Sequence, residues 1–432
     1  MTDTPSTGWN RNYRWYVVGM LWFIAFFNYA DRQAIFSVFP LIGEEMGLSN
    51  TEKGVLGSAF MWVYGLMAPI AGLMVDRVSR KKAILWGLQV WSVICMLTAT
   101  STKFGHLIFW RAAEGLGETF YFPASMSLIS DYHPKETRSR AMGLHQTSVY
   151  MGTIAGGFFA GLIGQHYGWR WSFVVFGAFG VVLGFVLQRF LREPARGAAD
   201  YASAGVDVNM QTAVKRLAPG QAILEILGNS TALTLLGGFM CANFVAAVLL
   251  TWMPSFLTEE FGMTLAMSGL TATLYVQLAS MCAAPLGGWL ADTLRVRFPG
   301  GRMAVQALGL LCGAPFVLLC GMTQSVGTLI LALTFWGFFK GLYDANIFAS
   351  IYDVVRPEAR GVAAGMMNAI GWLIGGGSAP ILIGMIADQR SLGFAIATAS
   401  VVYVMGSLFL AFGIVMFVRR DSERMQAALR EG

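Results

Sequence analysis

"APIAGLMVDR", residues 68–77, recurs as "APLGGWLADT" at residues 284–293, with the Ala-Pro, a Gly and the Asp in the same places. A second pair holds nearly the same offset, because "EEMGLSNTEKG" at 44–54 matches "EEFGMTLAMSG" at 259–269. A third pair is an aspartate, an arginine and a glycine in each half: Asp131, Arg138 and Gly143, then Asp353, Arg360 and Gly365. Three matches in register indicate an internal repeat.

The composition places this repeat in a membrane. Of 432 residues, 56% are hydrophobic and only 12% are charged, whereas soluble domains carry roughly a quarter of their residues as charges. A hydrocarbon core about 30 Å thick needs about 20 apolar residues per helix. Twelve segments meet this length, at roughly 15–38, 54–75, 83–101, 106–130, 140–164, 170–191, 230–257, 267–290, 303–322, 327–353, 361–386 and 394–418. The sequence predicts an all-α integral membrane protein of two pseudo-symmetric six-helix bundles.

The longest polar interruption, residues 192–221, divides these segments six and six. We therefore expect an N-terminal bundle over 1–191, a cytoplasmic linker over 192–228 and a C-terminal bundle over 229–432. Most of the 30 Lys and Arg residues lie in the termini and in the loops of one side, which the positive-inside rule places in the cytoplasm. The prediction is a multi-pass monomer of the cell (inner) membrane with both termini cytoplasmic. The net charge of +6 then reflects topology and not a nucleic-acid partner.

Ionisable side chains inside the predicted spans are the main functional candidates. Each costs about 2.5–3.5 kcal/mol or more at membrane depth, so it normally faces a partner or a hydrated cavity. They occur on three segments, as Asp31 and Arg32, as Arg111, Glu114 and Glu118, and as Lys340 and Asp344. Spacings of three and four residues place the members of the second and third sets on one helix face each.

Each of three pairs also fits a purely structural role. The alternatives are a helix-end pair at the outer surface for Asp31 and Arg32, a static buried pair for Arg111 and Glu114, and an i, i+4 bridge for Lys340 and Asp344. Glu118 differs, because its own helix offers it no base within one turn. We expect a buried carboxyl without a fixed partner, and we predict Glu118 as the best single candidate for reversible protonation.

The repeat relates some of these residues across the halves. An offset of 222 maps Glu118 onto Lys340, so a pseudo-twofold would set an acid opposite a base. An offset of 215 maps Asn28 onto Asn243, but it maps Asp31 and Arg32 onto alanines. Further polar side chains that can complete a site, or simply join helices, are Tyr29, Tyr64, Tyr121, His145, Gln146, Tyr275, Gln277 and Asn346.

The loops "GLMVDRVSRKK" at 72–82 and "GGWLADTLRVR" at 287–297 resemble the loop between helices two and three of the major facilitator superfamily and its weaker copy between helices eight and nine. The resemblance implies alternating access, in which two bundles rock around a site near the midplane. It also implies a cytoplasmic latch, with gating residues at Asp76, Arg77, Arg80 and Asp292. The alternative is a solvated basic turn that only fixes topology.

"NYADRQAI" at 28–35 and "RAAEGLGETFYFPA" at 111–124 are similar to the anion:cation symporter family of that superfamily. The resemblance implies proton-coupled symport of a small organic anion, a sugar acid or carboxylate, with protons carried by Asp31 and Glu118. The expected substrate-binding residues are Arg111, Lys340, Arg32, Tyr29, Tyr64, Asn28, Asn243, Tyr121, Gln146 and Asp344. "GLGE" and the later "GGGSAPILIGMIAD" at 375–388 also resemble the Spinster family, whose lysolipid transport is the alternative.

Other classes find little support in the sequence. No span has two histidines at metal-ligand spacing, and Gly-x-Ser-x-Gly and a dinucleotide glycine fingerprint following a strand are missing. We therefore expect a protein that is not an enzyme and that holds no metal or organic cofactor. H⁺ is the expected coupling ion, and Na⁺ stays open, although no cluster of oxygen ligands stands out. A receptor that binds the same ligand without transporting it also stays open.

Overall fold

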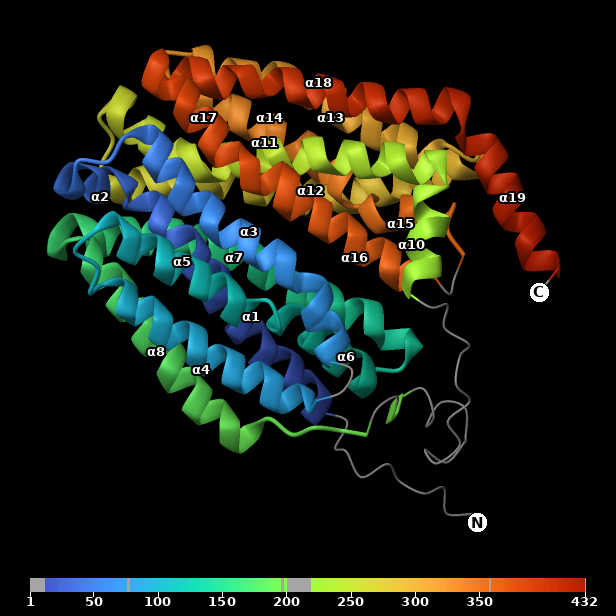
Figure 1. Ribbon diagram of the computed structural model, residues 1–432, viewed down its shortest axis with the longest axis horizontal. Coiled ribbons are helices and arrows are strands. Elements are labelled where there is room, and N and C mark those ends of the chain that lie inside the picture. Colours follow the sequence, from blue (N-terminus) through green and yellow to red (C-terminus); the bar gives the residue numbers. More distant parts are fainter. Residues whose placement is uncertain (1–11, 76–77, 196–197, 200–218, 357–358, 432) are drawn as a thin grey trace.

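The computed structural model describes residues 12–75, 78–195, 198–199, 219–356 and 359–431 (Figure 1). In this part of the chain the helices of the first half are α1 (Tyr13–Ser37), α2 (Phe39–Met46), α3 (Asn50–Val75), α4 (Arg80–Thr98), α5 (Phe104–Glu118), α6 (Tyr121–Tyr132), α7 (Lys135–Tyr167) and α8 (Trp169–Phe190). Those of the second half are α10 (Pro219–Leu227), α11 (Ser230–Phe261), α12 (Leu265–Arg297), α13 (Gly301–Met322), α14 (Val326–Asp344), α15 (Ile347–Tyr352), α16 (Arg360–Ile370), η2 (Gly371–Gly376), α17 (Gly377–Gln389), α18 (Leu392–Met416) and α19 (Val418–Glu431).

The predicted fold class is confirmed. Every predicted span is helical, and nine helices in the described residues are long and apolar enough to cross a membrane. The three other predicted spans coincide with α1, with α4 and with the pair α5 and α6. Figure 1 shows the helices of the two halves close together at the end that carries α2 and spread apart toward the end that carries α19.

The repeat seen in the sequence is also a repeat of backbone geometry. Gly47 ends α2 with φ 66°, and Gly262 ends α11 with φ 62°. Both belong to the matched Glu-Glu-x-Gly segments. A left-handed backbone conformation just after a helix is strained for any residue with a Cβ, so glycine is favoured at both positions. The sequence match therefore reflects the same helix ending used twice.

Two predicted spans that correspond in the repeat are each interrupted, and neither interruption was predicted. The span 106–130 breaks between α5 and α6, directly after Glu118, and the span 327–353 breaks between α14 and α15, directly after Asp344. Pro123 accounts for the first break, because its ring has no N–H for the carbonyl of Thr119 and clashes with it. At the second break, the Asn346 amide donates to the carbonyl oxygens of Leu342 at 3.1 Å and Gly287 at 3.2 Å.

Polar contacts join the two halves at the α2 end. The Asp388 carboxylate, at the end of α17, accepts hydrogen bonds from the backbone N–H groups of Asn50 at 2.8 Å and Thr51 at 2.9 Å. Lys53 lies 3.5 Å from Glu259. Deeper in the protein, the Gln33 amide donates to the carbonyl oxygen of Leu250 at 3.0 Å. These contacts cross between the halves, so the α2 end is closed.

Glycines let the two halves meet closely at this end, and this makes a testable prediction. A Cβ on Gly157 of α7 would overlap the backbone of Gly269 on α12. Gly157→Val should therefore separate the halves at the α2 end, because backbone atoms cannot yield as a flexible side chain can. We expect a longer spin-label distance between exposed positions 44 and 260, measured by pulsed electron paramagnetic resonance in a background without exposed native cysteines.

Gly143→Val is the matched control, since Gly143 lies on the same helix and no atom lies within 4 Å of a Cβ placed there. It should leave the distance between the labels unchanged. An unchanged distance in Gly157→Val as well would contradict the close approach of α7 and α12.

Candidate functional site

The first element of the site is an ion pair between α1 and α5. Arg32 Nε donates to Glu118 Oε2, and both side chains are buried, at 10% and 0% exposure. The guanidinium also lies over the rings of Tyr64 at 4.4 Å and Tyr29 at 4.7 Å. The prediction that Glu118 lacks a fixed partner is therefore wrong. Its base comes from another helix, which spacing along one helix cannot reveal.

A second buried pair lies one turn earlier on α5. Arg111 donates to Glu114 within the helix, and neither side chain is more than 1% exposed. Both guanidinium groups contact the ring of Phe60 on α3: the ring centroid lies 4.8 Å from Arg111 Cζ and 5.0 Å from Arg32 Cζ. Gly115 lets α5 approach α3 closely here, because a Cβ there would overlap the Phe60 carbonyl oxygen. The two arginines thus share a contact with one aromatic ring.

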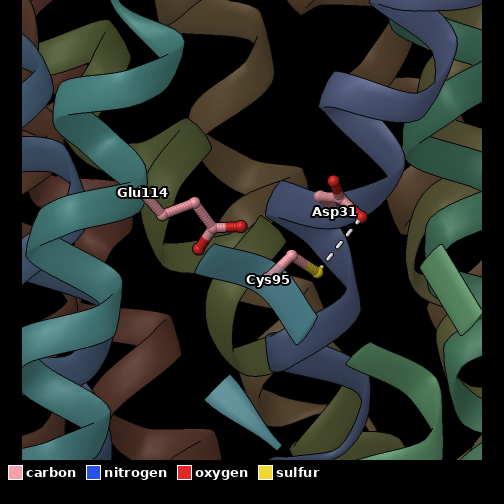
Figure 2. Close-up of side chains that lie close together, drawn as sticks. All are labelled: Asp31, Cys95 and Glu114. Atoms are coloured by element: carbon pink, nitrogen blue, oxygen red, sulfur yellow. Dashed lines mark hydrogen bonds between the residues drawn. The ribbon is translucent and has the colours of Figure 1, made fainter. Parts of the chain in front are cut away.

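Asp31 forms no ion pair with either arginine among the described residues, and it contacts a cysteine. The Cys95 thiol of α4 donates to Asp31 Oδ1 at 3.6 Å, and the Glu114 carboxylate points toward both residues (Figure 2). Asp31 is 1% exposed, so it is not part of a helix-end pair at the surface. The surface alternative for Asp31 and Arg32 is wrong, since Arg32 pairs with Glu118 inside the protein.

The second half carries its own charged site. Lys340 donates to Asp344 one turn later on α14, with side-chain exposures of 16% and 27%. A cavity of about 80 Å³ adjoins this pair and is also lined by Asn243, Tyr343 and Tyr403. Glu118 and Lys340, which the repeat relates to each other, are thus each paired within their own half, Glu118 with Arg32 and Lys340 with Asp344.

The remaining predicted binding residues are distributed around these pairs. Asn28 is 1% exposed on α1, and Gln146 is half-buried on α7. The Asn243 amide donates to the Phe239 carbonyl oxygen at 3.0 Å. The Tyr121 hydroxyl donates to the Leu21 carbonyl oxygen at 2.6 Å and lies 2.9 Å from His145 Nε2. Its hydrogen-bonding capacity is thus used between helices of the first half.

Two of the predicted gating residues, Arg80 and Asp292, lie at the α19 end. Buried Arg80 pairs with Asp131, and its guanidinium also lies 3.3 Å from Glu193. In the second half, Arg302 lies 2.7 Å from Asp292 and 2.8 Å from Asp353. The two aspartates that these arginines share, Asp131 and Asp353, are partners in the repeat. Both halves therefore carry an equivalent arginine–aspartate ion pair, which we call the clasp: Arg80–Asp131 in the first half and Arg302–Asp353 in the second. Asp76 and Arg77 lie outside the described residues.

Glu193 gives the first clasp a pH dependence. Partial burial raises the pKa of its carboxyl, but hydrogen bonds from Ser79 and Arg80 outweigh burial and hold the pKa below its ordinary value of 4.5. A group whose pKa is lowered by folding stabilises the fold above its ordinary pKa and loses this effect as the pH falls through the folded value. Glu193→Gln should lower the thermal unfolding midpoint at neutral pH, and this difference should shrink below about pH 4.5.

Glu44→Gln, which removes an exposed carboxylate at the α2 end, serves as the control and should leave the midpoint unchanged at both pH values. Equal midpoints for Glu193→Gln and wild type at neutral pH would show that Glu193 does not stabilise the clasp.

Several residues of the site could not be identified as functional candidates from the sequence. Phe60 and Cys95 each lie within an apolar run. Glu193 lies in a polar stretch rich in other charges. Arg302 is the exception, because the offset of 222 maps Arg80 directly onto it. The repeat could therefore have found Arg302.

Comparisons with known proteins agree with this architecture. The chain is 27% identical over 399 residues to the probable galactarate/D-glucarate transporter GudP of Escherichia coli (strain K12), which covers 87% of each protein. It is 28% identical over 388 residues to protein spinster of Drosophila melanogaster, which covers 87% of this chain and 62% of the fly protein. The solved structure of a bacterial homolog to the human lysosomal transporter Spinster, inward-facing and unoccupied, aligns with a TM-score of 0.80 at 22% identity, over 97% of this chain and 99% of that one.

The relatives and the fold are those of transporters, so the prediction that the chain is not an enzyme is confirmed. The Major Facilitator Superfamily profile matches residues 21–300 and again residues 235–432. The two matches overlap, as expected where one architecture occurs twice in a chain. Together they extend from the first predicted span to the end of the chain, and the chain is therefore a membrane transporter of the Major Facilitator Superfamily.

Proposed function

We propose that the protein is a proton-coupled symporter of a small organic anion, a sugar acid or carboxylate, and that it works by alternating access. The observation that carries this proposal is the set of buried charges: two arginine–glutamate pairs beside Asp31 in one half, and Lys340 with Asp344 beside a cavity in the other. Charges at membrane depth normally mark substrate and proton pathways. The protein acts as a monomer in the cell (inner) membrane with both termini in the cytoplasm.

The carboxylate of the substrate binds between the two bundles, against Arg111 and Lys340. Arg111 keeps two guanidinium nitrogens without a partner among the described residues, so it can add a bond to an anion. Protonation of Glu118 releases the Arg32 guanidinium from its ion pair, and protonation of Asp31 removes a negative charge near the incoming anion. The loaded site is then close to neutral, which favours occlusion and rocking of the bundles.

Release takes place at the α19 end. With the predicted topology this end faces the cytoplasm, and it is the end toward which the helices spread apart (Figure 1). Loss of the two protons to the cytoplasm restores the Arg32–Glu118 pair and the charge of Asp31. The cavity then repels the anion, and substrate leaves. The likeness to a protein named as a galactarate/D-glucarate transporter supports a dicarboxylic sugar acid as the first candidate.

A Spinster-like lysolipid transporter is the second candidate. The similarity to protein spinster, at 28% identity, supports it. A lysolipid would also need a charged headgroup site, which the same arginines can provide. Unlike a sugar acid, however, it carries an acyl chain that must be accommodated beside the cavity.

Counterflow in proteoliposomes tests the substrate class. Vesicles preloaded with unlabelled D-glucarate should take up labelled D-glucarate, and an excess of galactarate should compete. Competition by lysophosphatidylcholine but not by galactarate would favour the lysolipid candidate. Binding of D-glucarate without any exchange across the bilayer would indicate a receptor and contradict transport of this substrate.

A further inference from the structure

Three ionisable side chains from three helices meet in the core of the first half. They are Asp31 of α1, Cys95 of α4 and Glu114 of α5, and Figure 2 shows their side chains converging. The potential ligand atoms of the three residues all lie within 4.8 Å of one another. Each residue is at most 1% exposed. Two carboxylates are therefore held close together away from solvent.

Each of the two carboxylates in this cluster has one oxygen without a hydrogen-bond partner in the described structure. Asp31 Oδ2 and Glu114 Oε1 are buried and have no hydrogen-bond partner among the described residues. Asn28 lies three residues before Asp31, which places it on the same face of α1. It is 1% exposed, and its amide oxygen and nitrogen are also without a partner in the described structure. Buried polar atoms normally have a hydrogen-bond partner. The unpaired atoms of Asn28, Asp31 and Glu114 therefore indicate a partner that the protein itself does not supply.

Charge balance indicates what the missing partner is. Among the described residues of the first half, buried Arg80 pairs with Asp131 and buried Lys53 lies beside Glu259. The buried charges that remain, all on α1 and α5, are the acids Asp31, Glu114 and Glu118 and the bases Arg32 and Arg111. Three carboxylates against two guanidinium groups leave one negative charge uncompensated. An unpaired charge at membrane depth is costly. One positive charge near Asp31 and Glu114 would neutralise the set.

We propose that Asn28, Asp31 and Glu114 form a binding site for Na⁺. Carboxylate and amide oxygens are ligands that hard cations prefer. Ca²⁺ binds oxygen at about 2.3–2.6 Å, and Na⁺ is of similar size, so two oxygen ligands of one ion lie at most about 5 Å apart. The ligand atoms of Asp31 and Glu114 lie within 4.8 Å of one another, inside this limit. A divalent ion would overcompensate the charge. Cys95 orients Asp31 through its thiol and does not bind the ion.

The site does not depend on the identity of the transported anion. Only one further step rests on the proposed function: Na⁺ and the coupling proton would occupy Asp31 alternately, because both neutralise the same carboxylate.

Thermal unfolding of the purified full-length protein tests the site. NaCl is titrated at mildly alkaline pH, with choline chloride added to keep the ionic strength constant. A ligand that binds only the folded state raises the midpoint with its concentration, so Na⁺ should raise it and K⁺ in the same protocol should not. Glu114→Gln and Asn28→Ala should each weaken the apparent Na⁺ affinity by at least about tenfold. Glu114→Asp should retain most of it.

Asp344→Asn is the matched control, because it removes a partly buried carboxylate from the other half and should keep the full Na⁺ response. An equal response to Na⁺ and choline would overturn the proposal, and so would an unchanged response in both ligand variants. Loss of the response in Asp344→Asn alone would place any site elsewhere. If Glu114→Gln does not fold, Asn28→Ala decides, since it leaves both ion pairs intact. Failed Na⁺ binding with intact D-glucarate counterflow would overturn this site and leave the proposed function standing.

Discussion

Glu118→Gln should abolish substrate-driven proton uptake and leave counterflow of labelled D-glucarate in place. Glutamine has the shape of glutamate and still offers Arg32 a carbonyl oxygen, but it cannot take up or release a proton. Exchange needs only binding and rocking of the bundles, whereas net symport also needs the proton to leave. The measurement pairs a pH-sensitive dye with a counterflow assay on the same proteoliposomes.

Glu44→Gln, an exposed carboxylate at the α2 end, is the control and should behave as wild type in both assays. Proton uptake that persists in Glu118→Gln would exclude Glu118 as the coupling residue. Loss of both activities in Glu118→Gln and in Glu118→Asp would instead indicate that the Arg32–Glu118 pair holds α1 and α5 together and has no role in coupling.

Lys340→Ala should reduce D-glucarate counterflow by roughly 30-fold to 4000-fold. Removing one charge from a buried ionic contact costs about 2–5 kcal/mol, and each 1.4 kcal/mol is a factor of ten. In the proposed site the lost contact is the one between the Lys340 ammonium group and the substrate carboxylate. The effect should appear mainly as a higher substrate concentration for half-maximal exchange.

The double variant Lys340→Ala/Asp344→Ala separates substrate binding from a static bridge. The single variant leaves Asp344 without its partner, and the double variant removes that defect. If Lys340 binds substrate, the double variant should be as stable as wild type and still transport poorly. Recovery of counterflow in the double variant would show that the pair only stabilises α14.

The fold could be predicted because it is repeated in the sequence. The matched Glu-Glu-x-Gly segments encode the same left-handed helix ending, at Gly47 and Gly262. The apolar spans coincide with the observed helices because a membrane helix must satisfy its backbone internally over the whole thickness of the bilayer. Spacing along one helix placed Lys340 and Asp344 on one face, since i and i+4 are neighbours there, and the structure pairs them as the alternative of an i, i+4 bridge has it.

Contacts between helices could not be predicted in this way. Arg32 and Glu118 are 86 residues apart in the sequence, and whether they meet depends on how α1 and α5 are rotated against each other. The same holds for the contact of both arginines with Phe60 and for the contact of Cys95 with Asp31. No proline follows Asp344 within the next turn, so the sequence does not indicate an interruption there. The interruption is accompanied by a hydrogen bond from the Asn346 amide to the Gly287 carbonyl oxygen on a neighbouring helix.

Proton movement driven by substrate tests the coupling proposal most directly. Wild-type protein is reconstituted into vesicles with no initial pH gradient, and D-glucarate is added outside. Proton-coupled symport predicts alkalinisation of the external medium that starts with the addition of substrate and collapses on addition of a protonophore. D-glucarate uptake without any proton movement, in the absence or presence of Na⁺, would contradict proton coupling.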